Sequence, residues 1–188
     1  GTAFYTTSPA QAFSELLPIG GQLLMATFAD GGPQELWRSD GTAAGTIRLR
    51  TFDTVSCPNG CAQTSLYDLT AVGSTLFFVG NAGEARGIWR SDGTQAGTAL
   101  ISPPTEDSAL LRDLTAVGDQ LFYVKQIGTG ADEEHELWRS DGTAAGTIRL
   151  RQFGPLIGSG GRITTLVGAN CTLFFRVARL SSGTVSQE

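Results

Sequence analysis

The chain has 188 residues, of which 40% are hydrophobic and 16% are charged, so it is long enough to bury a sizeable core and has a globular composition. Its formal net charge is −5, which argues against nucleic acids and anionic membranes as partners, because basic surfaces bind them. No apolar run is long enough to span a membrane.

The strongest feature of the sequence is a repeat with a period of roughly 50 residues, which is typical of repeat architectures. The segment ELWRSDGTAAGTIRLR occurs identically at 35–50 and 136–151, and a looser copy, GIWRSDGTQAGT, lies at 87–98. A quieter match precedes each copy and occurs a fourth time, at 16–23, 69–76, 114–121 and 166–173. In the fourth match Asn170 replaces a glycine, and asparagine also tolerates the positive φ of a tight turn.

The pattern predicts four short strands in each repeat. The first ends at an Ala-Val pair before a glycine turn, and the second is an apolar run at 76–79, 121–124 and 173–175 that must be covered on both faces. The third is Glu-Leu-Trp-Arg-Ser. The fourth, at 46–50, places Ile47 and Leu49 on one face and two arginines on the other, as expected for an edge strand with one wet face.

These strands predict an all-β fold, specifically a β-propeller of four-stranded antiparallel blades. We expect repeats at about 14–65, 66–110 and 111–160, a partial blade at 161–188, and an outer strand of a preceding or closing blade at 1–13. The turn density excludes stacked helical repeats, and a parallel β-helix fits less well. Because the repeats begin with part of one blade and end within another, we expect the chain to be a piece of a larger array, or a partner chain to supply the missing strands. A complete four-bladed ring is the alternative.

The Ser-Asp-Gly-Thr segment predicts the turn between the third and fourth strands. Its aspartate can accept backbone N–H groups, its glycine gives conformational freedom, and the tryptophan of each repeat can pack between blades. We assign structural roles to Trp37, Asp40, Gly41, Thr42, Trp89, Asp92, Gly93, Thr94, Trp138, Asp141, Gly142 and Thr143. The alternative is a ring of ligand or calcium sites, but each turn offers one carboxylate where calcium needs several oxygens, so we expect no cofactor.

These motifs resemble the ELWxxDGT repeat family of bacterial exported proteins and are similar to the Asp-box hairpin of sialidase-type propellers. The copies at 35–42 and 136–143 match ELWxxDGT at every fixed position, whereas the middle copy has Gly87 and Ile88 in place of Glu-Leu. The resemblance implies a secreted or cell-surface β-propeller, often in long tandem arrays, and it transfers no catalytic residue.

The cysteines and the histidine offer little chemistry. Cys57 and Cys61 enclose a Pro-Asn-Gly turn and favour a small loop disulfide over half of a metal site, because no second pair completes a zinc set. We expect Cys171 to be buried on a strand. We expect His135, the only histidine, to be a solvated loop residue after the acidic stretch 132–134.

Three functions fit these features. The first is a non-catalytic exported scaffold that binds a protein or polymer partner through the loops that differ between repeats, at 53–64, 81–86, 102–108 and 126–134. The second is a carbohydrate-binding propeller with repeated shallow sites. The third is a divergent sialidase-type hydrolase, which needs an arginine cluster and a tyrosine nucleophile from among Tyr5, Tyr67 and Tyr123. No motif selects catalytic carboxylates, a phosphate loop or a nucleophile elbow, so we expect no enzyme.

Overall fold

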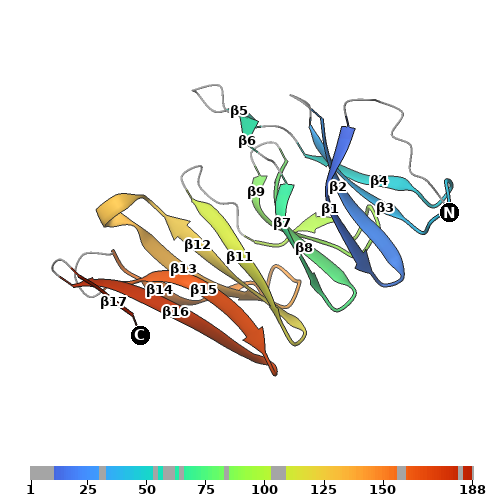
Figure 1. The fold of residues 1–188 in the computed structure, drawn as a ribbon. Coiled ribbons are helices and arrows are strands. Elements are labelled where there is room, and N and C mark those ends of the chain that lie inside the picture. Colours follow the sequence, from blue (N-terminus) through green and yellow to red (C-terminus); the bar gives the residue numbers. More distant parts are fainter. Residues whose placement is uncertain are drawn as a thin grey trace. The chain divides into compact units, whose positions relative to one another are not determined.

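The protein is all-β, and its strands form antiparallel sheets that follow one another along the chain (Figure 1). The computed structural model describes residues 11–29, 33–52, 55–56, 62–63, 66–82, 85–102, 109–155, 160–181 and 184–187. In these residues three sheets have four strands and a fourth has three. The predicted all-β class with four-stranded antiparallel sheets is therefore confirmed.

Each sheet is built from strands that are consecutive in sequence and lie side by side in that order. The first sheet contains β1 (Gln11–Ile19), β2 (Gln22–Ala29), β3 (Gln34–Ser39) and β4 (Ile47–Phe52). The second contains β7 (Leu66–Val72), β8 (Thr75–Ala82), β9 (Ala85–Ser91) and β10 (Ala99–Leu100). The third contains β11 (Leu110–Val117), β12 (Gln120–Ile127), β13 (Glu134–Ser140) and β14 (Ile148–Phe153). The fourth contains β15 (Arg162–Ala169), β16 (Thr172–Ser181) and β17 (Thr184–Gln187).

The chain divides into two compact units, Gly1–Leu100 with the first two sheets and Ile101–Glu188 with the last two. Two short elements complete the described structure, a pair formed by β5 (Val55–Ser56) and β6 (Ala62–Gln63) and a 3-10 turn at Gly130–Asp132. Strand β1 begins at Gln11, so residues 11–13 pair within the first sheet and do not belong to a separate outer strand. No helix in the described residues is long and apolar enough to cross a membrane.

The tight turn between the first two strands of each sheet follows the repeat. Gly73 and Gly118 have φ angles of 58° and 60°, and Asn170 takes the same conformation with φ 48°, as predicted. Cys171 follows it with φ 58° and is exposed, so the expectation of a buried strand residue was wrong. Two successive residues with positive φ make the two-residue turn typical of β-hairpins, which places Cys171 in the turn.

The core of the first unit lies between its two sheets. The first sheet contributes Ile19, Leu24, Ala26, Leu36, Leu49 and Phe52, and the second contributes Leu66, Leu76, Phe78 and Trp89. Phe52 meets Phe78 and Trp89 edge to face, with ring centroids 5.4 Å and 5.3 Å apart. The Arg50 guanidinium lies 4.4 Å above the Trp89 ring. Trp89 therefore packs between two sheets, as its repeated position predicts.

The second unit has a comparable core, formed by Val124, Leu137 and Phe153 of the third sheet and Ile163 of the fourth. Its outer strand β14 is more exposed than β4 of the first unit, although residues 148–151 are identical to residues 47–50. Leu49 is 6% exposed and its equivalent Leu150 is 45% exposed. In the first unit Leu100 of β10 packs against the cluster that contains Leu49, whereas the described part of the fourth sheet has no strand equivalent to β10.

We expect Phe52→Ala to lower the free energy of unfolding of the first unit by about 3–5 kcal/mol, because it empties a fully buried site shared by two sheets. Urea unfolding followed by tryptophan fluorescence measures this loss. The control is Phe174→Ala, at a position that is 58% exposed, where a change within about 0.5 kcal/mol is expected. Equal losses in the two variants would contradict a core located between the sheets.

Candidate functional site

The aspartate of each Ser-Asp-Gly-Thr segment is bonded inside its own turn. Asp40 Oδ1 accepts the Thr42 backbone N–H at 2.9 Å and the Thr42 hydroxyl at 2.7 Å. Asp92 and Asp141 make the same two bonds with the threonine two residues on. These bonds, above all the one from the threonine hydroxyl, hold the pKa of each aspartate below its usual value.

Further hydrogen bonds close this turn into a ring. Thr42 Oγ1 accepts the Gly45 N–H at 2.9 Å, and the Thr46 hydroxyl donates to the Thr42 carbonyl at 2.7 Å. Because that hydroxyl's proton is already used, the Ser39 hydroxyl must be the donor in its 2.7 Å contact with Thr46. The other two copies repeat every bond. The repeated side-chain hydroxyls and the bonded aspartate oxygen thus hold the turn.

The two glycines of the motif have different roles. Gly41 has a φ of 92°, which favours glycine, and its equivalents adopt the same conformation. At Gly45 the reason is space, because a Cβ there would lie 2.0 Å from Asp40 Oδ1. The same clash would occur at Gly97 and Gly146. The second glycine recurs in all three copies, but its reason lies in the folded position of the aspartate and not in any sequence pattern.

The glutamate of the motif links the tryptophan to the outer strand. Glu35 accepts the Trp37 indole N–H at 3.0 Å and pairs with Arg48 at 2.6 Å. Glu136 makes the same bonds with Trp138 and Arg149 in the third sheet. Both glutamates are nearly buried, so each needs its partners to offset desolvation.

The middle copy replaces the glutamate and the arginine together. Gly87 stands in place of the glutamate, and Leu100 stands in place of the arginine. The Trp89 indole N–H instead donates to the Gly80 carbonyl at 3.1 Å. Losing the arginine alone would leave a buried carboxylate without its cation, which is costly, and the paired replacement avoids that state.

His135 is fully buried on β13, so the expectation of a solvated loop residue was wrong. Its Nε2 lies 2.6 Å from Glu133 Oε1, and its Nδ1 accepts the Ile163 backbone N–H at 3.2 Å. Arg112 Nη2 lies 3.1 Å from the same Nδ1. Burial is the largest cause that lowers the pKa of the imidazole, and the Glu133 hydrogen bond acts in the opposite direction. The acidic stretch misled the sequence analysis because the strand begins within it, at Glu134.

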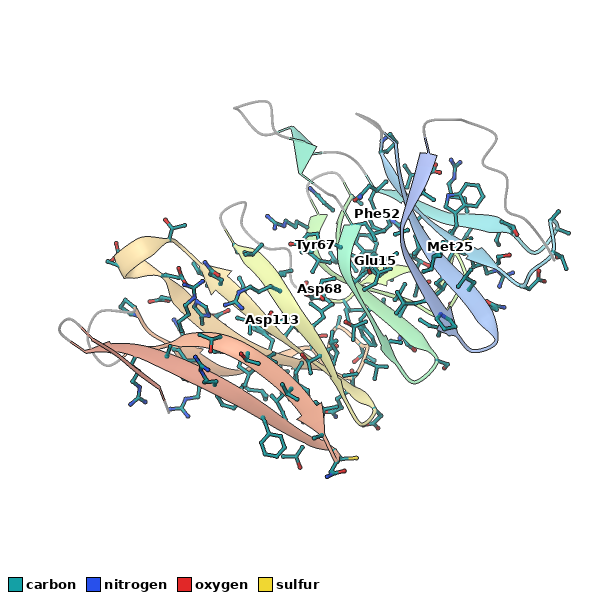
Figure 2. The ribbon with its side chains drawn as sticks, viewed as in Figure 1. Glu15, Met25, Phe52, Tyr67, Asp68 and Asp113 are labelled. Atoms are coloured by element: carbon teal, nitrogen blue, oxygen red, sulfur yellow. The ribbon has the colours of Figure 1, made fainter. Side chains whose placement is uncertain are left out.

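A further group of acidic residues escaped the sequence analysis. In the first strand of the first three sheets the register shifts at a bulge, and an acidic residue lies at the equivalent sequence position in each, namely Glu15, Asp68 and Asp113 (Figure 2). Asp68 and Asp113 lie within the bulge, whereas Glu15 follows it and pairs with Ala26. Asp68 and Asp113 have φ angles of 56° and 59°, a conformation that costs energy in residues other than glycine. The Asp-Leu-Thr-Ala-Val-Gly string common to two repeats could have revealed them. Bulges often occur beside functional sites, so each of these carboxylates marks a candidate position within its own sheet.

The tyrosines considered as nucleophiles have other surroundings. Tyr123 is buried, stacks on Trp138 with ring centroids 6.0 Å apart, and has its pKa raised by burial, which keeps the phenol protonated. The Tyr67 hydroxyl accepts a hydrogen bond from Arg86 at 3.1 Å. Tyr5, Cys57 and Cys61 lie outside the described residues. Within those residues, no group of three or more His, Cys, Asp or Glu side chains could hold a metal ion.

We expect Gly97→Ala to destabilise the first unit by about 1–3 kcal/mol, because the new methyl group would overlap the Asp92 carboxylate and break the ring of hydrogen bonds. Gly154→Ala is the matched control, because nothing lies within 4 Å of a Cβ there. Urea unfolding of the two variants checks the prediction. If Gly97→Ala were as stable as its control, the packing reason for the second glycine would be incorrect.

A comparison with solved structures gives a weak likeness. No family model matches the chain, and no curated protein matches it. Among solved structures it is similar to the endo-arabinase from Bacteroides thetaiotaomicron VPI-5482, with 14% sequence identity, a TM-score of 0.37, and coverage of 92% of this chain and 72% of that chain.

Proposed function

We propose that the four sheets are consecutive blades of a β-propeller of the ELWxxDGT type, and that this propeller is a non-catalytic scaffold. One observation carries the proposal. The serine, aspartate, glycine and threonine residues that recur in the turn of every complete repeat are engaged in the same ring of hydrogen bonds within that turn. Side chains that hydrogen-bond within the turn of each blade stabilise the same turn in every repeat. A binding or catalytic site would instead need hydrogen-bonding groups that remain available to a ligand.

The packing within each unit supports the propeller. In each unit the two successive sheets bury an apolar core between their facing sides, and the inner strand β8 is buried on both of its faces. This is the arrangement by which neighbouring blades stabilise one another in a repeat protein. The resemblance of the motifs to exported repeats further supports a location outside the cell or at its surface.

We assign partner binding to the loops that differ between repeats. Most of the residues at 53–64 and 102–108, and two of those at 81–86, lie outside the described structure, but the loop at 126–134 is described throughout. Gly128 and Gly130 have positive φ angles of 72° and 68° and shape a 3-10 turn that leaves Asp132 exposed, while Glu133 folds back onto His135. A fixed loop with an exposed acidic tip suits a protein or polymer partner.

The outer face of the fourth sheet suits a further blade or a partner subunit. Phe174 and Val167 are 58% and 51% exposed there, although Leu24 and Phe77, which occupy the position of Phe174 in other sheets, are buried. Arg176 stands where Ala26, Val79 and Val124 are fully buried. A sheet that covered this face would therefore need apolar side chains together with a carboxylate for Arg176.

Replacing Asp40, Asp92 and Asp141 by alanine, one at a time, tests the scaffold against the calcium-binding and carbohydrate-binding alternatives. For a scaffold, each variant unfolds at lower urea concentration because the turn loses its acceptor, and neither calcium nor glycans bind the unmodified chain. Titration calorimetry with calcium and a glycan microarray measure the binding. Calcium or glycan binding by the unmodified chain that is lost in these variants would overturn the scaffold role.

A further inference from the structure

The residue before the Glu-Leu-Trp segment joins neighbouring sheets in both units. In the first unit Gln34 Oε1 accepts the backbone N–H of Leu66, which lies on the first strand of the next sheet, at 2.5 Å. Leu66 occupies the same repeat position as Ile163 of the fourth sheet. In the second unit His135 occupies the place of Gln34, and its Nδ1 accepts the backbone N–H of Ile163 at 3.2 Å. Each unit therefore has an equivalent hydrogen bond from a backbone N–H of its second sheet. Its acceptor is a side-chain amide in the first unit and an imidazole in the second unit.

The tautomer of His135 follows from its partners. A backbone N–H and a guanidinium can only donate, so the Ile163 N–H and Arg112 Nη2 both require a lone pair on Nδ1. The proton of the neutral ring is then on Nε2, which donates to Glu133 Oε1 at 2.6 Å. Arg112 also donates to the Ile163 carbonyl at 2.9 Å, so the imidazole and the guanidinium together hold one residue of β15.

We propose that His135 makes the junction between the third and fourth sheets acid-sensitive: a proton on Nδ1 removes the acceptor of the Ile163 amide, faces Arg112, and opens this contact. The Gln34 junction has the same backbone geometry and no titratable acceptor, so it stays closed over the same pH range. The inference goes beyond the scaffold role and does not depend on it.

The charged groups around the imidazole determine how strongly the closed junction opposes protonation of His135. Arg112 and Asp113 approach from β11 and pair with each other, and Arg162 of β15 lies 3.4 Å from Glu133 Oε1. The residues paired with His135 on β12 and β14 are the uncharged Gln126 and Phe153. Glu133 is thus the one carboxylate bonded to the ring among the described residues, and it is shared with Arg162, while Arg112 opposes a second positive charge.

The direction of the pH effect follows from proton linkage. Above the ordinary imidazole pKa of about 6.5 the ring is neutral whether the junction is closed or open. Below that pH the open junction binds a proton that the closed junction excludes, so acid favours opening. The equilibrium constant for opening then rises by up to about tenfold for each pH unit, until the closed form also binds a proton.

Hydrogen exchange of the Ile163 and Leu66 amides in the intact chain, followed by NMR from pH 7.5 to 5, tests the proposal after correction for intrinsic exchange. We expect the opening constant at Ile163 to rise by up to about tenfold per pH unit below 6.5, and that at Leu66 to stay constant. In His135→Gln the new amide can accept as Gln34 does, so Ile163 should lose its pH dependence. An unchanged opening constant at Ile163 between pH 7 and 5 would overturn the proposal.

A second measurement needs no variant. Because the chain has one histidine, the imidazole ¹⁵N signals of the labelled protein belong to His135 alone. We expect an unprotonated Nδ1 at pH 7.5 and a titration midpoint below 6.5 that coincides with the loss of Ile163 protection. A protonated Nδ1 at pH 7.5, or a midpoint above 6.5, would contradict the assigned tautomer and with it the switch.

Discussion

The constraint on which the structure depends is that a sheet with two apolar faces must be covered on both, and in the described residues of this all-β chain only another sheet can cover it. The inner strands carry large apolar side chains on both faces, so one sheet alone would leave half of them in water. In the first unit the side chain of Phe52, on the outer strand of the first sheet, packs against Phe78 and Trp89 of the second sheet. The same reasoning explains why Leu150 is exposed when the identical Leu49 is buried. Burial in this chain is decided by the neighbouring sheet and not by the local sequence.

The repeated turn gives each sheet that contains it the same strand register, so that each of these sheets presents the same apolar face to its neighbour. Strand β3 carries Trp37 and strand β4 carries Arg48, and Glu35 connects the two side chains. A hairpin whose register slipped by one residue would turn these side chains to the wrong face. The ring around Asp40 closes the loop between β3 and β4 with bonds from side chains and backbone, which fixes the register at its end. The motif can therefore be kept nearly unchanged while the connecting loops vary.

Sequence patterns predicted what repeats locally and failed where tertiary contacts decide. The four-strand pattern and the positive φ at Asn170 follow from turn chemistry and periodicity. The expectation that each tryptophan packs between sheets holds for Trp89, whereas Trp138 stacks on Tyr123 of its own sheet. The burial of His135 could not be predicted in this way, because its partner Ile163 belongs to the next sheet. The bulge acids Asp68 and Asp113 were hidden for another reason, since a left-handed aspartate within a strand has no periodic signal. The second glycine of the motif needed the position of a carboxylate that only the folded turn reveals.

The departures from the repeat are the places where one sheet acquires a property that the others lack. Gly87 and Leu100 remove an ion pair together, which leaves no buried charge unbalanced. His135 in the place of Gln34 keeps the backbone hydrogen bond to the next sheet and adds an ionisable group whose pKa is lowered by burial. Arg176 in the place of buried aliphatic residues changes what can cover the fourth sheet. A repeat fold tolerates such changes because each sheet contacts only its neighbours, so a new property at one junction leaves the other unchanged.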